Sequence, residues 1–588
     1  MGGQLPVVGA QVQVYAAGTT GYGSAGTALA TAATTDQNGA FTIQGNTACP
    51  SGSSLTYVIA SGGHTGTGAD NSAIVLIAPL GTCSSLSSST TVTVNEVTTV
   101  AAAWALAPFL HTGGAVGTSA GNAPGLTNAF ALVNNLVDVT SGVAPGKAAP
   151  ANATIPTSKI NTLADILSAC VEQSSASACS TLFTNATPAG GSAPANTLDA
   201  ALNIVRNPGV TPAALFALAG SSSPFQPSLA AAPPDWILAV NYTGGGLNTA
   251  GSLGVDGSGN VWVADYFGAV TELSATGAVV SPAAGFTGGG LSESYGLAVN
   301  QDGSVWVTDE QSDGSVNGGE GAVTVLNSSG APVSGASGYS VGGIFFPLAV
   351  AADTDGTVWI ADYGDSTATK LAKDGTAISP STGFGSAQLE GPVAVAIDAN
   401  HTAWFADQAA QSGSVTSISA DGSKVNTVVC GGDAPSGLAA DAIAVAATGA
   451  TGHLWTANYY SDSVSELAIG ADGSATVVGT AYTAGGIEHP NGLAVDGAGN
   501  VWVANYRGNS VSELAGAGAA QPGAPFSPAT GFGSDASLIA PFAVAIDGSG
   551  NVWVSNQGYN AQKQYTLTQF IGAATPVKTP VLGPPQLP

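Results

Sequence analysis

In its C-terminal 340 or so residues, the chain alternates short apolar runs with glycine-rich polar turns, and one arrangement recurs seven times. In one copy, residues 494–495 end an apolar run and residues 496–500 (DGAGN) form a tight turn. Residues 501–504 (VWVA) are apolar again, and residues 510–514 (SVSEL) alternate. Short apolar or alternating runs separated by glycine turns predict antiparallel β-strands, because glycine adopts the positive φ that such turns need. Each copy is therefore predicted to form one small antiparallel sheet.

A tryptophan in the second strand marks every copy, and successive markers lie 44 to 53 residues apart. The markers are Trp262, Trp306, Trp359, Trp404, Trp455, Trp502 and Trp553. A repeat of this length built from strands predicts a seven-bladed β-propeller, here over residues 235–575. Residues 237–247 (ILAVNYTGGGL) are similar to residues 285–291 (GFTGGGL), which precede the second copy. We therefore expect the strand at 237–243 to complete the seventh blade and remove the free sheet edge.

Two further modules precede the repeats, so the whole chain is predicted to be mainly β with a helical insertion. Residues 1–96 contain alternating stretches at 11–15, 40–43, 56–59 and 91–94, which predict a small β-sandwich. Residues 97–220 change to a helical period and predict about five short, alanine-rich helices that act as a spacer. Residues 221–234 predict a proline-rich linker, and residues 576–588 a proline-rich tail.

One predicted helix has Ile160, Leu163, Leu167 and Val171 on one face, with Asn161 and Asp165 opposite. A second has the stripe Leu198, Ala201, Leu202 and Val205, and a third begins at Thr211-Pro212.

The composition argues against two classes of binding partner and favours one cellular location. Only 8% of the 588 residues are charged, and the net charge of −27 argues against nucleic-acid and anionic-membrane partners. No apolar run is long enough to cross a bilayer. The surface must be built from small polar residues, which suits a secreted or cell-surface protein. The start at Met1 lies within a predicted domain, so we expect that a signal peptide has been trimmed.

The cysteines support the same compartment. Cys49 is expected to pair with Cys83 and Cys170 with Cys179, which leaves Cys430 free. The alternative is that all five are reduced and buried, and none has the spacing of a zinc site.

One polar residue ends the second strand of every repeat. These residues are Asp265, Asp309, Asp362, Asp407, Asn458, Asn505 and Asn556. By symmetry they are expected to ring one mouth of the central channel, where carboxylates and amides would suit Ca²⁺ or Mg²⁺. The alternative is structural: each side chain hydrogen-bonds its own turn.

Tyrosines follow four of these positions and predict an aromatic rim that binds ligand. They are Tyr266, Tyr363, Tyr459 and Tyr506. Glu488 and His489 lie in a loop expected at the same mouth and are the candidate acid–base pair, with an ordinary exposed loop as the alternative.

These repeats resemble NHL-type repeats and the seven-bladed streptogramin B lyase-like propellers over residues 235–575. That resemblance implies binding at a propeller face, or a lyase that uses a histidine with Mg²⁺; only His489 lies in a suitable place. Gluconolactonase-like propellers hold a channel metal with Glu, Asn and Asp, which the ring also permits. At the N-terminus, residues 6–12 (PVVGAQV) and 34–43 (TTDQNGAFTI) resemble the carboxypeptidase regulatory-like (transthyretin-like) domain, an accessory sandwich without catalytic residues.

The favoured function is non-enzymatic binding of a protein or carbohydrate at the cell surface. A metal-assisted lyase or lactone hydrolase in the channel is the first alternative, and a structural element of an extracellular assembly is the second.

Overall fold

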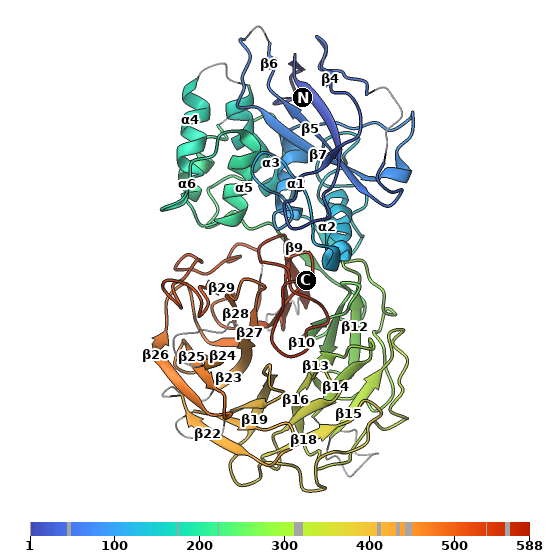
Figure 1. Cartoon of the computed structure of the whole chain (residues 1–588), viewed down its shortest axis with the longest axis vertical. Coiled ribbons are helices and arrows are strands. Elements are labelled where there is room, and N and C mark those ends of the chain that lie inside the picture. The colour runs from blue at the N-terminus through green and yellow to red at the C-terminus, as the bar shows by residue number, and fades with distance from the viewer. Residues whose placement is uncertain are drawn as a thin grey trace. The chain divides into compact units, whose positions relative to one another are not determined.

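The computed structural model describes all residues except 1, 44–48, 67, 173–175, 221–222, 311–320, 409–412, 431–434, 442–449, 537 and 559–564. By internal contacts the chain divides into two compact units (Figure 1). Unit 1 comprises residues 1–240, 548–551 and 570–574. Unit 2 comprises residues 241–547, 552–569 and 575–588.

Unit 1 is built on one antiparallel sheet in the order β3-β2-β5-β7, with β4 also pairing β2; β1 and β6 form a separate pair. The strands are β1 (Val7–Val8), β2 (Gln11–Ala16), β3 (Thr27–Ala28), β4 (Ala33–Thr34), β5 (Leu55–Ser61), β6 (His64–Thr65), β7 (Val75–Thr82) and β8 (Ala153–Thr154). Strands β2 and β5 confirm two of the four predicted stretches.

The other two predicted stretches are not strands. In the structure, residues 40–43 and 91–94 carry no strand pairing. Phe41, Ile43 and Val92 still pack against the unit 1 core as partly buried side chains. Their alternation therefore reflects burial on one side without a hydrogen-bonded neighbour.

The helices of unit 1 are α1 (Glu96–Ala105), α2 (Ala123–Leu136), α3 (Thr157–Val171), α4 (Ala176–Asn185), α5 (Thr197–Arg206) and α6 (Pro212–Phe216). The apolar stripes predicted on α3 and α5 are buried, and α6 begins at the expected proline. Strand β7 contacts α1, α2 and α5, so the strand-rich and helical segments share one unit. Among the described residues, no helix has the length and hydropathy needed to cross a membrane.

The polar face predicted for α3 is also buried. Asn161 donates to the carbonyl of Pro227 (3.0 Å), and the carboxylate of Asp165 accepts from the backbone N–H of Phe225 (3.0 Å). Both partners lie in the proline-rich segment 221–234. This segment is therefore packed along α3 by hydrogen bonds, which explains why α3 carries polar residues where solvent was expected.

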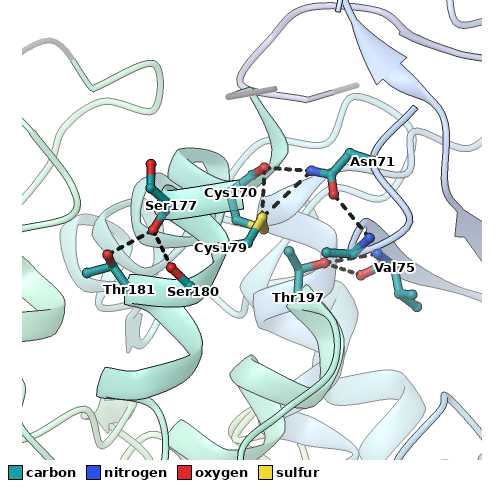
Figure 2. Close-up of a disulfide and its surroundings, with 9 residues drawn as sticks. Asn71, Val75, Cys170, Ser177, Cys179, Ser180, Thr181 and Thr197 are labelled. Carbon is teal, nitrogen blue, oxygen red and sulfur yellow. Dashed lines mark hydrogen bonds between the residues drawn. A yellow bond between two sulfur atoms is a disulfide. The ribbon is translucent and has the colours of Figure 1, made fainter. Parts of the chain in front are cut away.

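Two disulfides form, Cys49–Cys83 and Cys170–Cys179, and Cys430 is a buried free thiol, as predicted. Figure 2 shows that the second disulfide joins the end of α3 to α4. Beside it, Asn71 donates to the carbonyl of Cys170 (2.9 Å), which fastens the same point to the loop before β7.

Unit 2 consists of seven small antiparallel sheets, named ring sheets 1 to 7 in chain order. Ring sheets 1 to 3 are β10 (Ala250–Val255), β11 (Val261–Asp265) and β12 (Ala269–Leu273); β13 (Ser294–Val299), β14 (Val305–Asp309) and β15 (Ala322–Leu326); and β16 (Pro347–Ala352), β17 (Val358–Asp362) and β18 (Thr367–Leu371). Ring sheets 4 and 5 are β19 (Pro392–Ile397), β20 (Ala403–Asp407), β21 (Ser414–Ile418) and β22 (Val425–Val429); and β23 (Pro435–Asp441), β24 (Ala450–Asn458), β25 (Ser463–Gly470) and β26 (Ala475–Tyr482). Ring sheets 6 and 7 are β27 (Pro490–Val495), β28 (Val501–Asn505) and β29 (Ser510–Leu514); and β30 (Pro541–Ile546), β31 (Val552–Asn556), β32 (Thr566–Phe570) and β9 (Ala239–Tyr242).

The first strand of each ring sheet contacts the first strand of the next, and β30 contacts β10. The seven first strands, called the inner strands below, therefore follow one another in a closed cycle (Figure 1). This is a mainly β, propeller-like arrangement of small antiparallel sheets.

Aromatic pairs hold neighbouring ring sheets together. Every marker tryptophan is at most 1% exposed, and six of the seven pack against an aromatic ring from a segment beyond the third strand of the same sheet. Phe286, for example, stacks on Trp262 at 5.6 Å, and a Cβ on Gly330 in the next sheet would clash with its ring. The glycine of one sheet therefore makes room for the aromatic pair of the previous one.

A second contact recurs in three of the ring sheets. The carbonyl of Gly245 accepts hydrogen bonds from the hydroxyls of Thr271 (2.9 Å) and Ser281 (2.8 Å). Gly342 is bonded in the same way by Thr369 and Ser379, and Gly485 by Ser512 and Ser527. In each of these sheets, the segment before the first strand is thus hydrogen-bonded to the third strand and to the outer segment that follows the third strand.

Candidate ligand-binding site at the mouth of the ring

A cavity of about 760 Å³ lies inside the ring of unit 2. Every inner strand contributes to its wall, largely through Gly, Ala, Val and Leu residues. Each inner strand begins beside the end of the second strand of its sheet; Pro490, for example, pairs with Asn505. It ends at the turn that leads into that second strand. The cavity therefore has two ends, one at the starts of the inner strands, called the mouth, and one at the turns, called the base.

Residues of the segment 575–588 line the cavity at the base. Val577, Val581, Gly583 and Pro585 line the cavity. The carbonyl of Thr575 accepts from the backbone N–H of Gly497 (3.2 Å), and the N–H of Val577 donates to Asp547 (3.2 Å). Both partners lie where an inner strand meets its turn. The segment predicted as a proline-rich tail is thus part of the cavity wall.

Among the described residues, the lining of the mouth is aromatic and almost uncharged. The residue after the second strand lines the cavity in six of the seven ring sheets; the six are Tyr266, Glu310, Gln408, Tyr459, Tyr506 and Gln557. Tyr295, Tyr460, Asn491 and Phe542 extend this lining. Three of the four predicted tyrosines therefore line the cavity. Tyr363 does not; it occupies the equivalent position in ring sheet 3 with 41% exposure.

Two aromatic clusters shape this mouth. Tyr459 packs edge-to-face on Tyr460 (5.0 Å between centroids) and lies 6.0 Å from Tyr506. Tyr295 from ring sheet 2 meets Phe542 from ring sheet 7 edge-to-face at 5.5 Å, which bridges the inner strand of ring sheet 1. Aromatic faces of this kind offer flat apolar surfaces with polar hydroxyls at their edges.

The predicted Asp/Asn ring lies outside this lining. All seven side chains are fully buried, and none borders the cavity. Thr271 donates its hydroxyl to Asp265 (2.8 Å), and the Nδ2 of Asn505 donates to Ser512 (2.9 Å). Equivalent third-strand hydroxyls contact Asp309, Asp407, Asn458 and Asn556. These hydrogen bonds lie within the sheet and run to its third strand, whereas the structural alternative named the turn. Ca²⁺ or Mg²⁺ binding by the ring stays a prediction.

Burial changes the acidity of the ring carboxyls. Desolvation raises the pKa of Asp265 and Asp309 to about 7 and that of Asp407 to about 6, and it raises the pKa of Asp362 well above its usual range. Hydroxyl and backbone N–H donors oppose this effect in each case without cancelling it. The four ring carboxyls are therefore largely protonated in mildly acidic solution.

The two catalytic candidates are separated in the structure. Glu488 is exposed, and its backbone N–H donates to Asn505 (3.3 Å). The Nδ1 of His489 lies instead 3.0 Å from the carboxylate of Asp462, and its ring packs edge-to-face on Tyr459 at 4.9 Å. Neither candidate borders the cavity. The structure thus places His489 behind the tyrosine rim with Asp462, a residue that the sequence did not single out.

Asp462 could have been found from the repeat. It precedes the third strand, has positive φ (48°), and accepts from the backbone N–H of His489 (2.7 Å). Asn509 contacts Ala540 of the next sheet through the same kind of bond (2.9 Å). The hydrogen bond from the backbone of the next sheet therefore recurs at equivalent positions, whereas the contact between Asp462 and an imidazole is particular to this sheet.

Comparison with known proteins finds only distant likenesses. No protein-family model matches the chain, and no curated protein matches it. A streptogramin B lyase structure is 16% identical with a TM-score of 0.39, covering 57% of this chain and 98% of its own. A virginiamycin B lyase from Staphylococcus aureus is 14% identical with a TM-score of 0.40, covering 57% of this chain and 99% of its own. A nidogen/laminin complex is 15% identical with a TM-score of 0.32, covering 46% of this chain and 93% of its own. No activity is carried over from likenesses this distant.

Proposed function

We propose that unit 2 is a seven-bladed β-propeller of an exported protein that binds an uncharged ligand at its tyrosine mouth without catalysing a reaction. The ligand class that suits the mouth best is a neutral oligosaccharide. The protein would then act as a binding module at the cell surface.

The blade count rests on how the ring joins its ends. Seven inner strands contact one another in a cycle. Strand β9, which precedes all of them in sequence, pairs with β32 at the end of ring sheet 7. Tyr242 of β9 stacks on Trp553, and its ring fills the space beside Gly277 of ring sheet 1. Tyr242 thus contacts both ring sheet 7 and ring sheet 1, the two sheets between which the ring closes.

The character of the mouth carries the binding proposal. Tyr266, Tyr459 and Tyr506 provide aromatic faces, while Gln408 and Gln557 provide amides. Among the described residues that line the cavity, Glu310 is the only one with a charged side chain. Flat aromatic faces beside amide donors and acceptors suit a ring-shaped, hydroxyl-rich ligand. A cavity of about 760 Å³ is also of the size that ligand pockets have.

Export is supported by covalent chemistry. Two disulfides in one chain are typical of proteins that fold in an oxidising compartment. The low charged fraction of 8% fits a surface of small polar side chains.

The test is calorimetric titration of the intact protein with neutral gluco-, xylo-, manno- and chito-oligosaccharides and an anionic uronic-acid oligosaccharide. We expect saturable binding of at least one neutral oligosaccharide and weaker binding of the anionic one, since the net charge is −27. Absence of binding to every neutral oligosaccharide would overturn the proposed ligand class.

The pair His489–Asp462 favours a second candidate, a lyase or lactone hydrolase. An imidazole beside a carboxylate is a pair that general acid–base catalysis uses, and these two groups lie 3.0 Å apart. This candidate requires the tyrosine rim to admit substrate to His489. Its test is turnover of cyclic ester and lactone substrates with and without Mg²⁺, in which His489→Gln must abolish any activity found.

A further inference from the structure

One turn at the base of the ring departs from the corresponding turns of five other ring sheets. The residue three positions before the marker tryptophan is a glycine with positive φ in ring sheets 1, 2, 3, 6 and 7; these are Gly259, Gly303, Gly356, Gly499 and Gly550. In ring sheet 4 the same position is His401, with φ of 61°. A residue with a Cβ pays a steric cost in this region that glycine avoids. The histidine therefore occupies a backbone conformation for which the five other turns use glycine.

His401 reaches across to the neighbouring sheet. Its Nδ1 lies 2.8 Å from Oδ1 of Asp353, which belongs to the corresponding turn of ring sheet 3. Asp355 of that turn completes a group of three whose ligand atoms all lie within 4.8 Å of one another. Within the described ranges, this is the only such group of three or more His, Cys, Asp or Glu side chains.

One carboxylate oxygen of Asp353 accepts no hydrogen bond. Its side chain is only 1% exposed, and its Oδ2 is fully buried and accepts no hydrogen bond. Its Oδ1, in contrast, is occupied by His401 and by the backbone N–H of Thr354 (2.6 Å). A buried carboxylate oxygen without a donor is costly, and a bound cation would satisfy it.

We propose that Asp353, Asp355 and His401 form a binding site for a divalent transition-metal ion that links ring sheets 3 and 4 at the base. One imidazole and two carboxylates are the donors that Zn²⁺ accepts, whereas Ca²⁺ prefers six or more oxygens. Three protein ligands leave a fourth position for water. His401 is 45% exposed on its side chain, which gives the ion access from solvent.

The surroundings are compatible with a cation. Lys370, the positively charged neighbour of Asp355, holds its ammonium group against the carbonyl of Ala420 (2.8 Å) and over the ring of Trp359. The ammonium group itself is therefore held by Ala420 and Trp359. This site is separate from the tyrosine mouth and does not depend on the function proposed for it.

The test is isothermal titration of the untagged, full-length protein with Zn²⁺, Mn²⁺ and Ca²⁺, together with melting curves. We expect Zn²⁺ to bind one site more tightly than Ca²⁺ and to raise Tm. His401→Gly restores the residue of the other turns, so it should fold well yet weaken Zn²⁺ binding at least tenfold. Asp355→Asn, at an exposed position, should do the same.

Asp302→Asn is the matched control. Asp302 accepts from the N–H of Ser304 (3.0 Å) just as Asp355 accepts from Thr357 (2.8 Å), but its turn has no histidine opposite. This variant should bind Zn²⁺ like the unaltered protein. The proposal is overturned if Zn²⁺ does not bind, if Ca²⁺ binds more tightly, or if His401→Gly binds Zn²⁺ as before, which would assign the ion to another histidine.

Discussion

Tyr242 stacks on Trp553 with 5.6 Å between ring centroids, and its hydroxyl donates to Gln569 (2.8 Å). The contact joins the strand that leads into unit 2 to the last ring sheet. Both aromatic residues are fully buried, and burial raises the pKa of the Tyr242 hydroxyl. One side chain from the start of unit 2 thus occupies the place that an outer-segment aromatic residue occupies in the other sheets.

Loss of that ring should destabilise the protein strongly. Tyr242→Ala removes a buried aromatic side chain, and such changes cost about 3–5 kcal/mol. Urea denaturation should register this loss, whereas Tyr363→Ala at a 41% exposed position should stay within about 0.5 kcal/mol. If the two variants were equally stable, β9 would not be needed for the integrity of the ring.

Stability should rise as the solution becomes acidic. Burial raises the pKa of Asp265, Glu272 and Asp309 to about 7, so each binds its proton more tightly in the folded than in the unfolded chain. Their stabilising contribution is complete below the unfolded value of about 4 and is lost as pH rises through about 7. Tm should therefore fall from pH 4 to pH 8. Asp138, whose pKa is lowered to about 2 by Lys147, acts in the opposite sense only below that range.

Replacing one ring aspartate by asparagine should isolate its share of this pH dependence. Asn occupies the Asp265 position in ring sheets 5, 6 and 7, so Asp265→Asn should fold normally. It should weaken the fall in Tm between pH 4 and pH 8, because one titrating group is gone. An unchanged pH profile in this variant would show that Asp265 does not contribute.

The two disulfides should differ in value. Their sequence separations are 34 for Cys49–Cys83 and 9 for Cys170–Cys179. Loop-closure entropy predicts losses of about 4 and about 2.6 kcal/mol on removal, respectively. Melting of the two double-serine variants measures the order, and a larger loss for Cys170–Cys179 would mean that its anchoring by Asn71 outweighs the entropic effect (Figure 2).

Local pattern was enough to predict the strands of the ring, the cysteine pairs and the stripes on α3 and α5. The turn at 496–500 and the strand with Trp502 are one copy of a pattern that predicts a strand pair, because turn chemistry and alternation are local. Residues 40–43 show the limit: their alternation is real, but a strand also needs a partner, and pairing partners are distant in sequence.

The candidate site was less accessible for the same reason. Asp462 meets His489, and Tyr295 meets Phe542, only because separate sheets converge. The ring of Asp and Asn was visible in the sequence, yet its orientation depends on the third-strand hydroxyls of each sheet. A repeated residue identifies a shared position, while the direction of its side chain follows from packing that the repeat alone does not express.

The most direct test of the binding account compares two tyrosines at equivalent positions. Tyr459 lines the cavity, whereas Tyr363 does not. Using the neutral oligosaccharide that binds best, calorimetry should find that Tyr459→Ala weakens binding at least tenfold, about 1.4 kcal/mol, while Tyr363→Ala binds like the unaltered protein. Equal affinities for both variants and the unaltered protein would contradict a ligand site at the tyrosine mouth.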